Sequence, residues 1–134
     1  MSLDFSEILD GGLEPLKEAI QRLIDAIESH EPQLITYGFH LNEQERVMTV
    51  TAVHPDSASL ELHMEIGEDQ FRKVGEFITL KQIYVYGHIS ERAREMLEQK
   101  ARMLGGATLN VSERFAGFDH LPAARDLGQT PDLT

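Results

Sequence analysis

Two histidines stand close together in the sequence, and their chemistry makes them candidates for acid–base catalysis. His54 follows a run of β-branched residues, and His63 shares one side of the next predicted helix with Leu60 and Met64. The ordinary pKa of histidine is near neutrality, so either imidazole could serve as a general base. A purely structural role is the alternative: His63 as a core histidine bonded to a carbonyl, and His54 as a local cap in a turn.

Metal chemistry has little support in the same segment. The eight residues between the two histidines do not match a ligand spacing on one element. A third ligand from Asp56 or Glu61 has no support from spacing. We therefore expect no metal site.

The tyrosines are the next candidates. Tyr37 shares one face of a predicted strand with Phe39. Its hydroxyl could bond a phenolic substrate or a neighbouring side chain in a core. Tyr84, Tyr86 and His88 share one face of a later strand, where they could line a ligand cavity or form a contact between subunits.

Composition excludes several classes of protein. The chain has 134 residues, with 12 Lys plus Arg against 23 Asp plus Glu, a formal charge of −11. Such a balance argues against nucleic-acid and anionic-membrane partners, which require basic surfaces. There is no cysteine, no secretory signal, no apolar run that could span a bilayer, no glycine-rich phosphate loop and no serine nucleophile motif. We expect a cytoplasmic protein with no cofactor.

The hydrophobic periodicity predicts an alternation of helices and strands within one domain, residues 1–120. A weak strand at 3–8 precedes an amphipathic helix over 13–30 and a hairpin of strands at 34–41 and 47–53. A helix begins near 57, is interrupted at Gly67, and resumes through 71–78. A strand at 83–88, a helix at 90–104 and a strand at 107–115 follow. We expect residues 121–134 to form an extended or disordered tail.

This order predicts an α+β sandwich in which helices cover one face of an antiparallel sheet. The other face must also be covered, because the strands carry apolar or neutral residues on both sides, among them Leu34, Val50, Ala52, Leu109 and Val111. We therefore expect a homodimer formed through the open face of the sheet.

One segment also carries a family resemblance. Residues 54–63 read His-Pro-Asp-Ser-Ala-Ser-Leu-Glu-Leu-His. This resembles the Trp-x-Asp, small-residue turn, Leu-Glu-x-His motif of the antibiotic-biosynthesis-monooxygenase-like family. Asp56, Leu60, Glu61 and His63 match in register, whereas His54 stands where many relatives have tryptophan. The resemblance runs from about residue 12 to 85, with weaker support to 118. Its other matches are Gly12, Glu31, Pro32, Tyr37, Phe71 and Phe77.

The resemblance implies a ferredoxin-like sandwich that pairs into a dimeric α+β barrel. It also implies a cofactor-independent monooxygenase of a small aromatic or polyketide-like compound, whose deprotonated form supplies electrons to oxygen. In that chemistry His63 or His54 would be the base, and Tyr37 or Tyr84 would stabilise the anion.

The substrate would then contact four further side chains: Tyr84, Tyr86, Met64 and Phe71. The competing hypothesis is a non-catalytic protein of the same fold that binds a small ligand or a partner, since the fold hosts unrelated activities. A roomy pocket on which histidines and a tyrosine converge would favour the enzyme. A pocket filled by Met64, Phe71 and Phe77 would favour the binding protein.

Overall fold

Five strands and three helices make up the part of the chain that the computed structural model describes, residues 1–120. They are β1 (Ser2–Ile8), α1 (Leu13–His30), β2 (Thr36–Asn42), β3 (Val47–Val53), α2 (Ser57–Gly75), β4 (Ile78–Tyr86), α3 (Glu91–Met103) and β5 (Thr108–Ser112). The expectation for residues 121–134 lies outside this range. None of the described helices combines the length and apolar composition needed to cross a bilayer.

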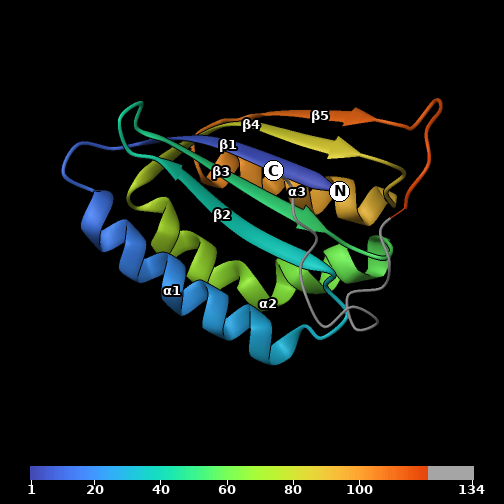
Figure 1. Cartoon of the computed structure of the whole chain (residues 1–134), viewed down its shortest axis with the longest axis horizontal. Helices are drawn as coiled ribbons and strands as arrows, with labels where there is room; N and C mark the ends of the chain where they lie inside the picture. The colour runs from blue at the N-terminus through green and yellow to red at the C-terminus, as the bar shows by residue number, and fades with distance from the viewer. Residues whose placement is uncertain (121–134) are drawn as a thin grey trace.

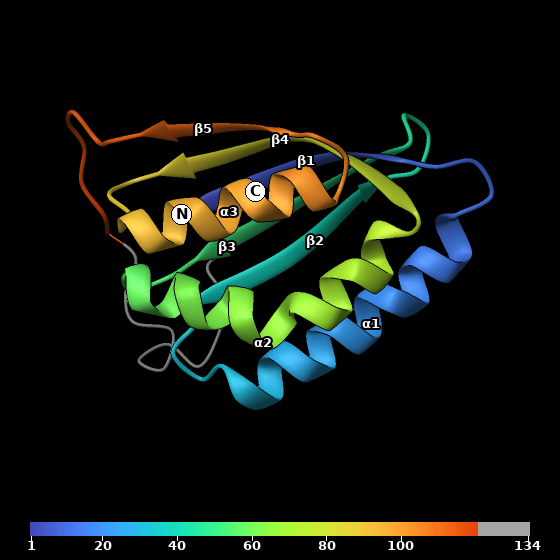
Figure 2. The same cartoon turned by 180° about the vertical axis from the view of Figure 1, so that it is seen from behind.

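The strands form one sheet in the order β2-β3-β1-β4-β5, with the N-terminal strand at its centre. The first four pair antiparallel, as expected, but β5 runs parallel to β4, so the sheet is mixed. The physical reason is the connection: α3 carries the chain back along the sheet between β4 and β5, and such a crossover returns it in the same direction. All three helices lie on one side of the sheet (Figures 1 and 2).

Alternation along β1 places its polar residues in the interior. Asp4, Ser6 and Ile8 face the helices and are buried, whereas Leu3 and Phe5 face the open side of the sheet. The pairing of β1 with β4 shifts register between Phe5 and Ser6. A shift of this kind lets one strand contribute an extra residue.

The extra residue on β4 is Lys81. As a result Leu80 and Ile83 both point into the core, and Tyr84 turns to the open face. The strand also starts earlier than the sequence pattern predicts, because Ile78 already pairs with Ile8.

The helices follow from apolar spacing and caps. The buried face of α1 repeats at three- and four-residue intervals through Leu16, Ala19, Ile20, Leu23 and Ile27. The Asp56 carboxylate accepts a hydrogen bond from the Ser59 amide at the start of α2, and Ser90 caps α3 in the same way through Ala93.

The predicted interruption of α2 at Gly67 is wrong, because the helix continues to Gly75. A side chain at Gly67 would collide with the Phe71 ring, which packs on the bare backbone there. This glycine therefore makes room for a neighbouring ring and does not end the helix.

Candidate functional site

The layer between sheet and helices contains an unusual concentration of buried polar side chains: Asp4, Ser6, Glu31, Ser59 and His63. Buried polar groups cost free energy unless they find partners. Their gathering in one region marks it as the candidate site.

Glu31 and His63 form the centre of this region. Glu31 ends α1, where its amide bonds the Ile27 carbonyl, and its side chain is fully buried. Nδ1 of His63, on α2, lies 3.1 Å from both carboxylate oxygens of Glu31. A carboxylate at Nδ1 fixes the neutral imidazole with its proton on that nitrogen, leaving the lone pair on Nε2. The arrangement can accept a proton at Nε2 and compensate the resulting charge.

Tyr37 packs against this pair from β2. Its ring meets that of His63 edge to face, with centroids 4.8 Å apart. Burial, and then the negative charges of Asp4 and Glu31, raise the pKa of Tyr37 well above its ordinary value. The hydroxyl therefore stays protonated at neutral pH and can donate a hydrogen bond.

His54 also lies beside His63, with ring centroids 5.2 Å apart. Its Nδ1 is 2.7 Å from the Ser59 hydroxyl, and that oxygen also accepts a bond from Gln33. Burial, followed by the neighbouring imidazole of His63, lowers the pKa of His54 to about 4. His54 is thus a neutral group and a weak base. His63 is the better placed of the two for proton transfer, because the Glu31 carboxylate orients its ring and can compensate a charge on it.

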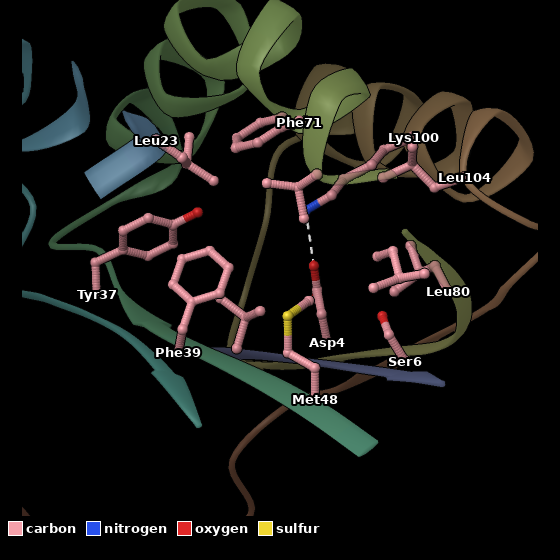
Figure 3. Close-up of a pocket in the computed structure, with 13 residues that line it drawn as sticks. Asp4, Ser6, Leu23, Tyr37, Phe39, Met48, Phe71, Leu80, Lys100 and Leu104 are labelled. Carbon is pink, nitrogen blue, oxygen red and sulfur yellow. Dashed lines mark hydrogen bonds and ion pairs between the residues drawn. The ribbon is translucent and has the colours of Figure 1, made fainter. Parts of the chain in front are cut away.

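A small cavity of about 30 Å³ lies beside Tyr37 (Figure 3). Nζ of Lys100 reaches into it from α3 and makes a 2.7 Å ion pair with Asp4, both side chains being about nine-tenths buried. The Ser6 hydroxyl lines the cavity and, within the described residues, has no hydrogen-bond partner. The remaining walls are apolar: Leu23, Phe39, Met48, Val50, Phe71, Val74, Ile78, Leu80 and Leu104.

A larger open groove lies between the last turns of α1 and the start of β2. Its volume of about 380 Å³ falls within the range typical of small-molecule sites. Glu31 and Tyr37 line this groove together with Glu28 and Thr36. The rest of its wall is apolar: Ile24, Ile27, Pro32, Leu34 and Ile35. Tyr37 thus belongs to both the groove and the small cavity, whereas His63 lines neither of the two.

The structure brings together four of the residues singled out by the sequence: His63, His54, Tyr37 and Phe71. Met64 is buried in the adjoining core.

Tyr84 and Tyr86 do not reach this layer. They stack on each other, 6.5 Å between centroids, on the outward-facing side of β4. Tyr86 meets His54 only at a separate hollow of about 200 Å³ at the end of the sheet.

Sequence reasoning missed Glu31, Asp4, Ser6 and Lys100 as functional candidates. Glu31 enters the family resemblance without a role. Lys100 lies in a helix of mixed charge whose polar residues look solvated. The sequence did carry one sign of buried polar groups: in β1, Asp4 and Ser6 alternate with apolar residues.

Within residues 1–120, no group of three or more His, Asp or Glu side chains is placed to hold a metal ion.

Two solved structures resemble this one at low sequence identity. MupZ from Pseudomonas fluorescens matches with a TM-score of 0.66 and 17% identity, over 91% of this chain and 96% of that chain. A proposed antibiotic biosynthesis monooxygenase from Caulobacter crescentus CB15 matches with a TM-score of 0.50 and 12% identity, over 57% of this chain and 76% of that chain. No family model matches the sequence, and no curated protein matches it.

At these identities the likeness concerns the fold alone. The element order, the five-stranded sheet and the one-sided helical layer agree with what the sequence resemblance predicts. The chain therefore has the ferredoxin-like α+β fold of the antibiotic-biosynthesis-monooxygenase-like proteins.

Proposed function

We propose that this protein is a cofactor-independent oxygenase of a small aromatic or polyketide-like compound, with His63 as its general base. The observation that carries the proposal is the buried Glu31–His63 pair beside Tyr37, next to a groove of ligand size. A carboxylate-oriented imidazole in a water-poor interior is suited to removing a proton from carbon or phenolic oxygen.

We assign the roles as follows. The substrate occupies the groove, which Glu31 and Tyr37 line. His63 contacts both of these residues from behind the groove wall, and its Nε2 takes the acidic proton while Glu31 compensates the imidazolium. The Tyr37 hydroxyl donates to the oxygen that becomes negative. The resulting anion supplies electrons to dioxygen, so that a methylene group and one molecule of oxygen become a carbonyl group and water. The oxidative half of this scheme comes from the family resemblance, and the acid–base half from the arrangement of side chains.

Oxygen uptake tests the proposal. A panel of polyhydroxylated aromatics and cyclic 1,3-diketones is incubated with the protein in an oxygen-electrode cell. We expect consumption with at least one compound, and a fall of about 10²- to 10⁴-fold in rate for His63→Ala, the usual contribution of a general base. The matched control is His30→Ala, an exposed histidine at the end of α1, which should keep the full rate. Equal rates for His63→Ala and the parent protein would remove His63 from the mechanism.

A non-catalytic ligand-binding or interaction protein is the second candidate. The small cavity cannot hold an aromatic ring, and Phe71 forms part of its wall. Saturable binding of the same compounds without oxygen uptake would favour this candidate.

We also propose a homodimer formed through the open sheet face. The side chains there include Leu3, Phe5, Val53 and Tyr84, with Thr49 and Thr51 beside them, and no helix covers this face within the described part of the chain. Val50 and Ala52, which the sequence argument used, are buried on the helix side instead. Faces of this composition usually meet a partner.

A further inference from the structure

The small cavity beside Tyr37 contains polar groups that the proposed function does not use. Ser6 is fully buried and its hydroxyl lines the cavity unpartnered. Lys100 brings an ammonium group to the same space, where Asp4 is its one hydrogen-bond acceptor within the described residues (Figure 3). An ammonium has three donors, so two N–H groups remain beyond the bond to Asp4.

Packing gives no reason for this ion pair. Replacing a buried pair by apolar residues of similar volume is often neutral or favourable for stability, and the surrounding walls are already apolar. Lysine and aspartate are almost never fully buried unless paired, and here each is the other's partner. What the pair leaves over is the Ser6 hydroxyl and the remaining donors of Lys100, and a bound acceptor would satisfy both.

The position of Tyr37 makes the two spaces neighbours. Tyr37 lines both the groove and the small cavity, so its side chain separates them, and a ligand that extends from the groove into the cavity must pass this ring. Phe71 joins the two halves of the site: its ring centroid is 5.2 Å from that of His63 and 4.7 Å from Nζ of Lys100. The groove has room for the body of a small molecule, and the cavity for a group of about two non-hydrogen atoms.

We propose that the cavity binds the carbonyl or phenol oxygen of the substrate, with Lys100 and Ser6 as the donors that hold it. This inference rests on the proposed function and deepens it, because it specifies an enolisable carbonyl compound or a phenol whose body lies in the groove. Lys100 then acts as a catalytic residue, and Asp4 holds its ammonium in place and compensates its charge.

The step it assists is proton transfer. The C–H bond next to the carbonyl breaks, the proton moves to Nε2 of His63, and the electron pair moves onto the carbonyl oxygen to give an enolate. For a phenol the O–H bond breaks in the same way. No electron leaves the substrate in this step, so it needs no oxidant. The donors of Lys100 and Ser6 meet the oxygen on which negative charge grows, where such bonds have their largest effect on rate.

Binding of acetylacetone under argon tests the assignment, because its enolate has its own ultraviolet absorption. We expect the parent protein to favour the bound enolate over the neutral form by about 10- to 100-fold relative to water, as charge-assisted hydrogen bonds imply. The double variant Asp4→Leu/Lys100→Met should lose this preference without leaving an unpaired buried charge. Ser6→Ala, which removes one atom, should lose several-fold. Lys81→Met, at an exposed lysine on β4, is the control and should bind like the parent.

The outcomes separate this inference from the proposed function. The cavity is not the oxygen site if the parent protein shows no preference for the enolate. The same conclusion follows if either the double variant or Ser6→Ala binds the enolate as strongly as the parent. His63→Gln should keep the enolate preference while losing the exchange of the acidic C–H for deuterium. Enolate binding that depends on Lys100, with no oxygen uptake for any compound, would leave the inference standing and remove the oxygenase. If the double variant fails to fold, Ser6→Ala decides.

Discussion

Replacing His54 by glutamine should remove a loss of stability that the parent protein suffers as the pH falls. The imidazole is held in the interior by the Ser59 hydroxyl, beside His63, and its pKa is lowered from 6.5 to about 4. Glutamine is neutral throughout and can still bond Ser59. The variant therefore tests the charge state of His54 with little change in packing.

The sign and size follow from linkage. Between pH 6.5 and 4 the unfolded chain binds a proton at His54 and the folded chain does not, so acid favours unfolding. At neutral pH neither state is protonated, and the group contributes nothing. A gap of about 2.5 pH units corresponds to about 3.4 kcal/mol at most. Because the residue is only partly buried, solvent screening reduces the expected loss to about 2 kcal/mol.

Urea unfolding followed by circular dichroism measures the effect. The quantity to compare is the change in the free energy of unfolding between about pH 7 and pH 4.5, parent minus variant, because other carboxylates and histidines titrate alike in both. We expect the parent to lose about 1 to 2 kcal/mol more than His54→Gln over this range. His30→Gln, at an exposed histidine, should lose as much as the parent.

Parallel pH profiles for the parent and His54→Gln would refute the reasoning. They would show that folded and unfolded chains protonate His54 at the same pH. The interior around it would then be wet, and the preference for His63 over His54 as the base would lose its main electrostatic argument.

Three further predictions concern packing, buried charge and assembly. Gly67→Ala should lower the free energy of unfolding in chemical denaturation by about 1 to 3 kcal/mol, because the new methyl group collides with the Phe71 ring. The better helix propensity of alanine offsets only part of this cost, and unchanged stability would show that the ring moves aside. Asp4→Asn should lower the free energy of unfolding by about 3 to 5 kcal/mol, because it leaves the Lys100 charge buried and unpaired. The double variant Asp4→Leu/Lys100→Met should change stability little. A double variant less stable than Asp4→Asn would contradict the ion-pair argument. Phe5→Glu, on the open sheet face, should convert a dimer to a monomer in native mass spectrometry; a monomeric parent would refute the dimer.

The elements of the fold could be predicted from the sequence because their signals are local. The 3.6-residue spacing of α1, the capping residues Asp56 and Ser90, and the alternation in β2 all act within a few residues. Two features could not be read in this way. The uninterrupted course of α2 depends on the Phe71 ring lying over Gly67, and the parallel partner of β5 depends on where α3 returns the chain.

The residues of the candidate site can be divided in the same way, into those with a local signal in the sequence and those that only the fold brings into place. His63, His54 and Tyr37 could be proposed because their chemistry and their place in a motif are visible in the sequence. Lys100 could not, since a lysine in a helix of mixed charge normally faces water, and only the approach of α3 to β1 places it beside Asp4. Tyr84 shows the opposite case: the bulge opposite the middle of β1 decides which face it takes, and a bulge leaves no mark in the alternation of β4 alone.

The two buried pairs support a functional site more strongly together than apart. A single buried pair is weak evidence on its own, because such a pair often contributes nothing to stability. Here Glu31 bonds the His63 imidazole and Asp4 pairs with the Lys100 ammonium, and the Phe71 ring lies close to both His63 and Lys100. Two costly pairs around one ring are what a reaction needs when a base removes a proton and a cation stabilises the negative charge that forms.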